Sequence, residues 1–399
     1  MNRHYKFSNT EINKILYSGI RNSTHHKIRR KGFIRKILKT AYILLLKHPK
    51  RHSHNNMQGS ILNDAPQKDW VPNDSQWKVL IFNENNEEVR PLLFIEMLLL
   101  FSFLFNVKII QKIIFGIAEI KALNFIKNRN IDHLICGHPT ILMTFIGFYL
   151  AKLDKNVITL QHGIYNLNEY KVLWFEKNIA THVIVYGHYF KELYNSQGVR
   201  EKNLIIGNPY FKSDISIKEK TKVPLHLVRK KVLFMGQQFH KVCPGIFEPY
   251  NKAISDLTDF LHGKDIDVYY KSHPRENIQK SLGEENISKL KFFVGKNDSD
   301  SFLNDFDIYY SINSSLLLET YLQKKICFQI DVHYDLNLDK FSDYSGIPLI
   351  DSKNLYNHLN QEIYEFYYDP KYLNISQTPR DSVINTITKI LISNEKVLL

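Results

Sequence analysis

The chain has few cysteines and no recognisable secretory leader. Its three cysteines, Cys136, Cys243 and Cys327, stand far apart, with neither a CxxC pair nor the Cys/His spacing of a zinc site. This scarcity argues against a disulfide framework and a cysteine-based zinc site, and it favours a reducing cytoplasm. The first twenty residues lack the apolar core of a signal peptide, so the expected location is cytoplasmic.

The longest apolar stretch is interrupted by polar side chains. Residues 91–110 read PLLFIEMLLLFSFLFNVKII and include Glu96, Asn106 and Lys108. A helix that crosses a bilayer needs ~20 predominantly apolar residues. We therefore predict a buried helix in this window, with a membrane span as the alternative.

Acidic residues are almost missing from the first part of the chain. Residues 1–52 hold 14 Lys or Arg and one acid, Glu11, which gives 14 − 1 = +13. The net charge of the whole chain is also +13, so residues 53–399 are neutral, with 39 basic and 39 acidic residues. The entire charge excess therefore lies in one N-terminal arm.

Within this arm, residues 26–52 place apolar side chains at helical spacing among many lysines and arginines. Such a helix can lie in an anionic membrane surface, at the inner face of the cytoplasmic membrane. It can equally be an ordinary domain helix with a solvated basic face. A nucleic-acid arm is disfavoured, because the rest of the chain is neutral and carries no known nucleic-acid module.

From Trp77 onwards, short apolar strands alternate with helical stretches, which predicts an α/β fold with parallel sheets. A charged segment without apolar periodicity, residues 214–224, separates two such series. The predicted organisation is a basic arm (1–52), a linker (53–75), an N-terminal Rossmann-like acceptor domain (76–213), a second linker (214–224), a C-terminal Rossmann-like nucleotide-sugar domain (225–375) and a C-terminal helix (376–399). Paired domains of this kind bind ligands between them, at the carboxyl ends of their strands.

Two histidine motifs follow predicted strands. His162 stands in Gln161-His162-Gly163, where a histidine can act as base, acid or phosphate donor, or can simply bond a loop carbonyl. Lys271 and His273 stand in Lys271-Ser272-His273-Pro274-Arg275, in which Pro274 fixes the turn. Three cationic groups within five residues suit a phosphate or a departing nucleotide, and a solvated surface turn is the alternative.

Two further strand ends carry candidate ligand-binding groups. Ser314 and Ser315 belong to the run Ser311-Ile312-Asn313-Ser314-Ser315, and hydroxyls at a helix N-terminus form an anion site or an ordinary cap. Glu319 lies one turn into that helix, where its carboxylate could accept from sugar hydroxyls. Gly236 and Gln237 end the first strand of the second domain and would line the space between the domains.

The motifs LQHG, GNP, VLFMGQ, KSHP and SINSS-LLLE, in this order over residues 155–330, resemble bacterial sialyltransferases and polysialyltransferases. Capsule Kdo transferases and CDP-glycerol glycerophosphotransferases share parts of the pattern. The resemblance implies a GT-B fold of two Rossmann-like domains facing across a cleft. It also implies that His273, Ser314 and Ser315 contact the donor phosphate, and that Glu319 binds donor hydroxyls.

The sequence departs from that family at the general base, because it lacks the acidic-acidic-Gly triplet. The acidic loop after the first predicted strand offers Glu84, Glu87 and Glu88 as substitutes, and His162 is the other candidate. The string Asp305-Phe306-Asp307 resembles a metal-binding DxD motif. Since it directly precedes an apolar strand, we interpret it as a turn and expect no obligatory metal and no cofactor.

These inferences predict an inverting glycosyltransferase that moves sialic acid or Kdo from a CMP-sugar to a glycan or lipid-linked acceptor, such as capsule or lipooligosaccharide. The alternatives are a CDP-glycerol-type glycerophosphotransferase, a UDP-sugar transferase or epimerase, and a non-catalytic GT-B scaffold. No nucleic-acid partner is expected.

Overall fold

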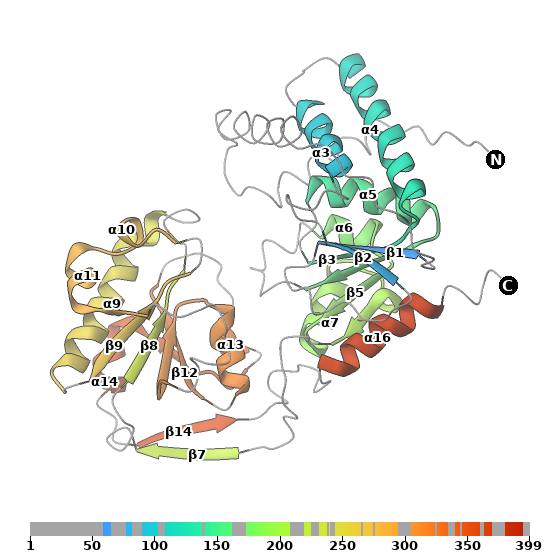
Figure 1. Ribbon diagram of the computed structural model, residues 1–399. Coiled ribbons are helices and arrows are strands. Elements are labelled where there is room, and N and C mark those ends of the chain that lie inside the picture. Colours follow the sequence, from blue (N-terminus) through green and yellow to red (C-terminus); the bar gives the residue numbers. More distant parts are fainter. Residues whose placement is uncertain are drawn as a thin grey trace.

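The computed structural model describes most of the chain beyond the basic arm. The described residues are 59–64, 77–81, 90–102, 108–137, 140–161, 173–207, 219–224, 231–237, 239, 244–264, 266–273, 276–293, 305–323, 325–333, 340–343, 345–359, 363–368 and 380–393. They form two lobes, each built around one sheet (Figure 1). The basic arm, residues 1–52, and the membrane role proposed for it lie outside the described residues.

The first lobe is built on a six-stranded parallel sheet in the order β2-β1-β3-β4-β5-β6. Its strands are β1 (Gly59–Asp64), β2 (Trp77–Ile81), β3 (Ile131–Cys136), β4 (Asn156–Leu160), β5 (His182–Val185) and β6 (Leu204–Ile206). All five residues of β4 are buried. A strand that is buried along both sides of its pleat requires cover on both faces of the sheet, which is what parallel sheets have.

Helices lie on both faces of this sheet (Figure 1). They are α3 (Arg90–Ser102), α4 (Lys108–Asn128), α5 (Ile141–Lys152), α6 (Trp174–Asn178) and α7 (His188–Ser196). Helix α5 begins where the Thr140 hydroxyl accepts a hydrogen bond from the Met143 N–H group at 3.3 Å. The predicted apolar helix of residues 91–110 is divided between α3 and the start of α4. Among the described residues, no helix is long and apolar enough to cross a bilayer.

The second lobe has a six-stranded parallel sheet in the order β10-β9-β8-β11-β12-β13. Its strands are β8 (Lys231–Met235), β9 (Asp267–Lys271), β10 (Lys291–Phe292), β11 (Ile308–Ser311), β12 (Ile326–Asp331) and β13 (Leu349–Asp351). Numbered along the chain, this is the order 3-2-1-4-5-6 of dinucleotide-binding sheets. The order reverses between β8 and β11, which makes their carboxyl ends the switch point of the sheet.

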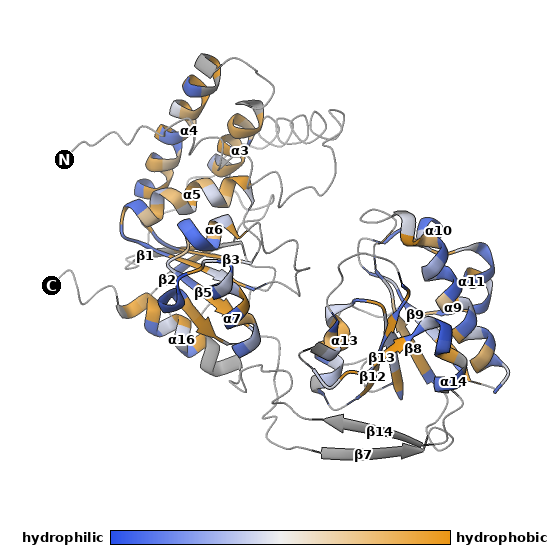
Figure 2. Cartoon of the chain, turned by 180° about the vertical axis from the view of Figure 1, so that it is seen from behind, coloured by the Kyte–Doolittle hydropathy of each residue, from blue (hydrophilic) through white to orange (hydrophobic). Residues whose placement is uncertain are grey.

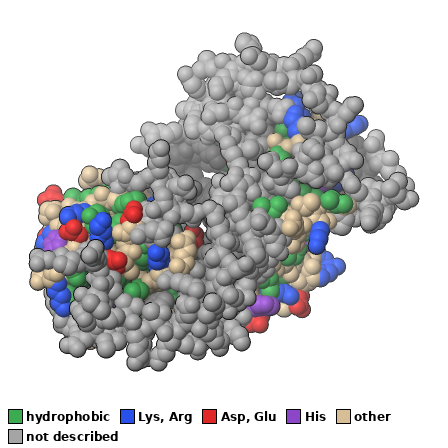
Figure 3. Space-filling view, turned by 60° about the horizontal axis from the view of Figure 1, so that its bottom comes forward, with side chains coloured by type: hydrophobic (Ala, Val, Ile, Leu, Met, Phe, Trp, Pro, Cys, Tyr) green, Lys and Arg blue, Asp and Glu red, His purple; other side chains and the backbone are tan. Residues whose placement is uncertain are grey.

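Among the described residues, five helices accompany this sheet, and pairs of oppositely charged side chains lie on their outer surface. The helices are α9 (Phe247–His262), α10 (Ile278–Ser281), α11 (Glu284–Lys289), α13 (Ser315–Leu322) and α14 (Leu355–Leu359). Lys289 bridges Asp259 of α9 and Glu285 of α11, at 2.6 Å to each. Side chains of both signs are interspersed over the described part of this face (Figure 3). Exposed pairs of this kind contribute little to stability.

Two segments predicted as linkers contain strands. Strand β1 lies in the polar segment 53–75, and it pairs with both β2 and β3. Its sequence, GSILND, is too short and too polar at its ends to show strand periodicity. Strand β7 (Glu219–Pro224) lies in the segment 214–224 and pairs antiparallel with β14 (Ile363–Tyr368). The structure therefore differs from the prediction at both places.

The C-terminal helix α16 (Arg380–Ser393) returns to the first lobe. Its buried residues Ile387, Ile390 and Leu391 pack with isoleucines and a leucine of the first sheet. The buried Asn156 side chain at the start of β4 donates a hydrogen bond to the Ile390 carbonyl at 3.1 Å. Helix α16 follows the second domain in the sequence, but it packs on the core of the first domain.

The fold class predicted from the sequence is confirmed. The chain is an α/β protein with two parallel six-stranded sheets, as in GT-B-like folds with two Rossmann-like domains.

Candidate functional site

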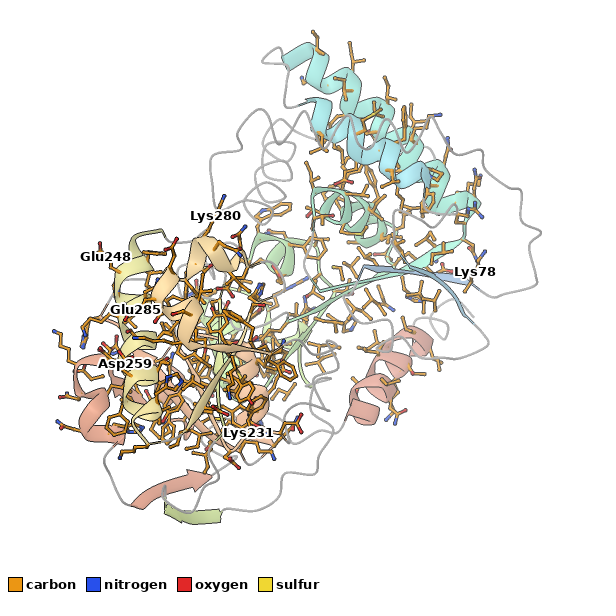
Figure 4. The ribbon with its side chains drawn as sticks, turned by 60° about the vertical axis from the view of Figure 1, so that its left-hand side comes forward. Lys78, Lys231, Glu248, Asp259, Lys280 and Glu285 are labelled. Atoms are coloured by element: carbon orange, nitrogen blue, oxygen red, sulfur yellow. The ribbon has the colours of Figure 1, made fainter. Side chains whose placement is uncertain are left out.

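The candidate residues of the second domain meet at one edge of its sheet. The strand register places Lys271, Met235, Ser311 and Gln329 side by side as the neighbouring strands end. Gly236 and Gln237 follow β8 directly, so they lie beside the residues that follow β11. Figure 4 shows Lys231, at the amino end of β8, and Lys280, on the helix after β9, at opposite ends of this domain.

Ser311 holds the switch point together. Its hydroxyl donates to the Met235 carbonyl of β8 at 3.0 Å and accepts from the Ser314 N–H group at 3.0 Å. The side chain is fully buried. Ser311 therefore joins the two strands at the reversal point and fixes the loop that leads into α13.

Ser314 has a different role in the same motif. It is the N-cap residue of α13, but its side chain makes no capping hydrogen bond. Its backbone N–H group is already bonded to Ser311, and Ser315 begins the helix half-buried. A hydroxyl that does not cap its helix, next to the positive end of that helix, is suited to an anionic ligand.

A side-chain amide joins the two sides of the switch point. The Nε2 atom of Gln237 donates to the Asn313 carbonyl at 3.1 Å, from the loop after β8 to the loop after β11. The Asn313 Oδ1 atom is buried and, within the part of the chain that is described, has no hydrogen-bond partner. Buried polar atoms are nearly always satisfied in folded proteins, so this acceptor marks a position where a donor group of a ligand or an ordered water would fit.

The loop that carries His273 is held by Glu276. The Glu276 carboxylate accepts from the His273 N–H group at 3.0 Å and from the Tyr270 hydroxyl at 2.7 Å. In return, the Glu276 N–H group donates to the His273 carbonyl at 2.8 Å. The Tyr270 hydroxyl lies 2.7 Å from the Tyr250 hydroxyl. This network anchors the histidine loop to α9 and β9.

Gly236 is the position where β8 approaches this network. A Cβ atom at Gly236 would lie 2.2 Å from the Tyr270 hydroxyl oxygen and 2.7 Å from Glu276 Oε2. Carbon atoms do not approach at such distances, so only glycine fits. The requirement for glycine thus arises from the neighbouring strand β9 and the loop that follows it, and it has no local signature beyond the glycine itself.

Burial changes the ionisation of two groups at this edge. Lys271 is half-buried, and loss of water around it lowers the pKa of its ammonium group. Burial raises the pKa of the Glu276 carboxyl. Hydrogen bonds from the Tyr270 hydroxyl and the His273 N–H group stabilise the charged form and partly offset this rise. Glu319 is half-buried on α13, one turn beyond Ser315. Hydroxyl, backbone N–H and ammonium donors in one partly desolvated place can bind a phosphate group.

Gln329 is a site residue that the sequence analysis missed. It is buried in β12, donates from Nε2 to the Ile312 carbonyl at 2.9 Å and accepts at Oε1 from the Phe341 N–H group at 2.8 Å. It therefore positions the loop after β11 from the next strand. Glu276 was missed as well, although it stands one residue beyond the Lys271–Arg275 motif.

Several predicted residues are not placed. Glu84, Glu87, Glu88, His162 and Pro274 lie outside the described residues. For the histidine motif of the first domain, the structure describes Gln161, whose Oε1 atom accepts from the Tyr186 N–H group at 2.9 Å. The glutamine of that motif thus connects β4 to the residue that follows β5.

The Asp305-Phe306-Asp307 string lies at the other edge of the second sheet. The Asp307 carboxylate accepts from the Lys231 N–H group at 3.2 Å, and the Asp307 N–H group donates to the Lys231 carbonyl at 3.0 Å. Asp307 therefore joins the amino ends of β11 and β8. This place is removed from the carboxyl ends where the candidate ligand groups gather.

The first domain contains a buried carboxyl group that the sequence analysis did not single out. Glu176 lies in α6, a short helix that follows the motif of Gln161, and is 8% exposed. Burial raises the pKa of its carboxyl from 4.5 to about 7, against the opposing effects of a backbone hydrogen bond and of Lys177. A carboxyl group that titrates near neutrality can accept or donate a proton under physiological conditions.

Glu176→Gln is expected to make stability less dependent on pH. Below pH 4.5, the carboxyl is protonated in both the folded and the unfolded chain, so it costs no folding free energy. As the pH rises from 4.5 to about 7, only the unfolded chain ionises freely, and the native protein loses stability. The free energy of unfolding of the variant, minus that of the native protein, should therefore be larger at pH 8 than at pH 4 by on the order of 2–3 kcal/mol. Denaturant unfolding at both pH values measures this change, and a difference that stays constant with pH would contradict it.

The fold resembles that of nucleotide-sugar enzymes of known structure. A Listeria monocytogenes protein named as a UDP-N-acetylglucosamine 2-epimerase superimposes with a TM-score of 0.52 and 12% sequence identity, over 85% of this chain and 97% of that one. The UDP-GlcNAc 2-epimerase of Neisseria meningitidis, bound to UDP-GlcNAc, gives a TM-score of 0.51 and 12% identity, over 84% and 99% of the two chains. The wall teichoic acid polymerase TagF has a TM-score of 0.46 and 12% identity, over 97% of this chain and 99% of its own.

Comparison of the sequence alone identifies no relative. No family model matches the chain, and no curated protein matches it. At 12% identity, the structural likeness establishes the fold and leaves the chemistry to be argued from the residues.

Proposed function

We propose that the chain is an enzyme acting on a nucleotide-activated sugar, with the donor's phosphate groups bound at the carboxyl ends of β8 and β11. The observation that carries this proposal is the Ser314 hydroxyl, which does not cap α13 and lies at the switch point of the sheet. In open α/β sheets, ligands bind at such a switch point, and phosphate binds at a helix N-terminus. Lys271 and His273 would add positive charge beside the departing nucleotide, and Glu319 would accept from donor hydroxyls.

A uridine nucleotide is the donor that we favour. The Listeria and Neisseria proteins, whose TM-scores exceed 0.5, are both named as UDP-GlcNAc 2-epimerases, and the second of them holds UDP-GlcNAc. We therefore propose a UDP-sugar transferase or epimerase. Transfer from a CMP-sugar, of sialic acid or Kdo to a surface glycan, is the second candidate, because the KSHP and SINSS motifs favour it.

The acceptor side of the reaction belongs to the first domain in this proposal. A base there would take the proton from the acceptor hydroxyl during transfer, or from the sugar during epimerisation. His162, Glu84, Glu87 and Glu88 are the candidates from the sequence, and Glu176 is added because burial brings its pKa to about 7.

A panel of nucleotides tests the proposed function. The melting temperature of the full chain is measured with UDP, CMP, CDP and GDP and with their sugar conjugates. A ligand that binds the native state adds about 2–3 kcal/mol of stability at 100 times its dissociation constant, and the melting temperature rises as a consequence. We expect UDP and a UDP-sugar to stabilise the protein more than the other nucleotides do.

Each outcome of the panel leads to a different conclusion. Selective stabilisation by CMP would replace the UDP proposal with sialic acid or Kdo transfer, and selectivity for CDP would favour glycerol phosphate transfer. Epimerisation of the donor without an acceptor separates an epimerase from a transferase. If no nucleotide stabilises the chain, the proposed enzyme function fails and the non-catalytic scaffold remains.

A further inference from the structure

Helix α4 presents hydrophobic side chains to solvent along its outer side. Ile113 and Ile120 are 58% and 60% exposed. Together with Ile110, Ile117 and Leu123 they recur at intervals of three or four residues, so they form one stripe on a helix of about 3.6 residues per turn. We call these five residues the α4 stripe. Figure 2 shows hydrophobic residues, interrupted by hydrophilic ones, along the coloured part of this helix.

The opposite side of α4 packs into the core of the first domain. Phe115, Ala118, Ala122, Phe125 and Ile126 are buried there, against α3 and the first sheet. The α4 stripe is therefore additional apolar surface, which the fold of the domain does not use. Contiguous exposed apolar surface of this kind marks an interaction site.

Lysines flank the α4 stripe, and no exposed acidic residue of α4 lies beside it. At helical spacing, Lys112 lies along one edge of the α4 stripe and Lys121 along the other, while Lys127 lies at its carboxyl end; all three are exposed. The helix contains one acidic residue, Glu119, which is half-buried and close enough to the buried Tyr149 of α5 for its charge to add to the rise that burial causes in the pKa of that hydroxyl. The outward side of α4 is thus apolar with basic edges.

From this arrangement we propose that α4 lies in the surface of an anionic phospholipid membrane, with the α4 stripe at the acyl boundary and the lysines among the headgroups. Helices that bind in the plane of a membrane have this pattern. Pairing of the α4 stripe with a second copy would bring six lysines together with no exposed acid of α4 between them. Cover by the basic arm, which carries a charge of +13, would meet the same repulsion. Anionic lipid is the occupant that complements both the apolar stripe and its cations.

The proposal concerns a surface of the first domain and does not depend on the proposed nucleotide site. It also differs from membrane binding by the arm alone, because substitutions in the α4 stripe would leave the arm unchanged. Binding through charge weakens as salt is added, whereas binding through the α4 stripe retains an apolar component that salt does not screen.

Vesicle sedimentation with the full chain tests the proposal. The chain is mixed with vesicles of phosphatidylcholine, with and without phosphatidylglycerol, at low and high salt. The test variant is Ile113→Asp with Ile120→Asp. The matched control is Leu153→Asp with Phe247→Asp, which replaces two other exposed apolar residues (48% and 40% exposed) and makes the same change in charge.

We expect the native chain and the control variant to bind vesicles that contain phosphatidylglycerol. The test variant should bind at least about tenfold more weakly, because two isoleucines no longer leave water. A fluorophore on Ile120→Cys should also brighten when these vesicles are added, with the labelled native chain correcting for its own cysteines. Since the substituted side chains are exposed, the melting temperatures should stay equal.

Three outcomes would overturn the proposal. The first is failure of the native chain to bind either vesicle. The second is equal binding of the test variant and the control. The third is a dimer in vesicle-free buffer that the test variant converts to a monomer, which would assign the α4 stripe to self-association.

Discussion

Replacing Gly236 with alanine is expected to lower the free energy of unfolding by about 3 kcal/mol, at the upper end of what overpacking costs. The added methyl group would lie 2.2 Å from the Tyr270 hydroxyl oxygen and 2.5 Å from its Cζ atom. Tyr270 cannot move aside cheaply, because it is fully buried, stacks on Phe234 with ring centroids 5.9 Å apart and bonds to Tyr250 and Glu276. Denaturant unfolding measures the loss.

A double variant separates this clash from other effects of the substitution. Tyr270→Phe removes the nearest atom, so Gly236→Ala with Tyr270→Phe should be more stable than the sum of the single losses predicts. Gly116→Ala in α4 is the control, because nothing lies within 4 Å of its added Cβ atom. Alanine in place of glycine inside a helix should raise stability by about 1 kcal/mol. If Gly236→Ala were as stable as the native chain, the packing at this site would have to differ from the one described.

Substituting Ser314→Ala together with His273→Ala is expected to reduce turnover, or the affinity for the stabilising nucleotide, by about 10² to 10³. Both residues lie at the carboxyl edge of the second sheet, where the proposed phosphate site needs donors. Titration calorimetry with the nucleotide identified by the panel measures affinity, and donor consumption measures turnover. Unchanged binding and turnover in this variant would rule out a phosphate site at the switch point.

Ser311→Ala is the matched control, three residues earlier in the same motif. The Ser311 hydroxyl serves the buried Met235 carbonyl and the Ser314 N–H group, so its loss should lower stability by about 1–3 kcal/mol. Ser314→Ala alone should leave stability nearly unchanged, because the Ser314 side chain makes no capping hydrogen bond. Substitution of Ser311 is thus expected to change stability, whereas substitution of Ser314 is expected to change ligand binding or turnover.

The pattern of the sequence predicted the fold class because the strands of parallel sheets are apolar along their whole length. Such strands as Asn156–Leu160 are recognisable without knowing their neighbours, and the polar residues that follow them must gather at one edge of the sheet. Residues 236–237, 271–273 and 311–315 could therefore be predicted to lie at one edge of the sheet from their positions after predicted strands. The proposed general base could not be predicted in this way, because the choice among Glu84, Glu87, Glu88 and His162 depends on distances.

The role of each residue within the site depends on contacts between segments distant in the sequence. Ser311 and Ser314 are chemically alike, and only the register of β11 against β8 gives one of them the Met235 carbonyl as its partner. Gln329 and Glu276 support loops through contacts that their own surroundings in the sequence do not reveal. The short strand β1 forms because β2 and β3 pair with it on both sides.

The amino-acid sequence by itself determined the α/β alternation and which polar groups end the strands, since these follow from local composition and periodicity. Only the tertiary structure decided which serine holds the switch point, why position 236 must be glycine, and where the last helix packs. It also decided that α4 keeps a hydrophobic stripe in solvent. The physical reason is that hydrogen-bond partners, steric limits and burial are set by neighbours that the folded chain brings together from distant positions.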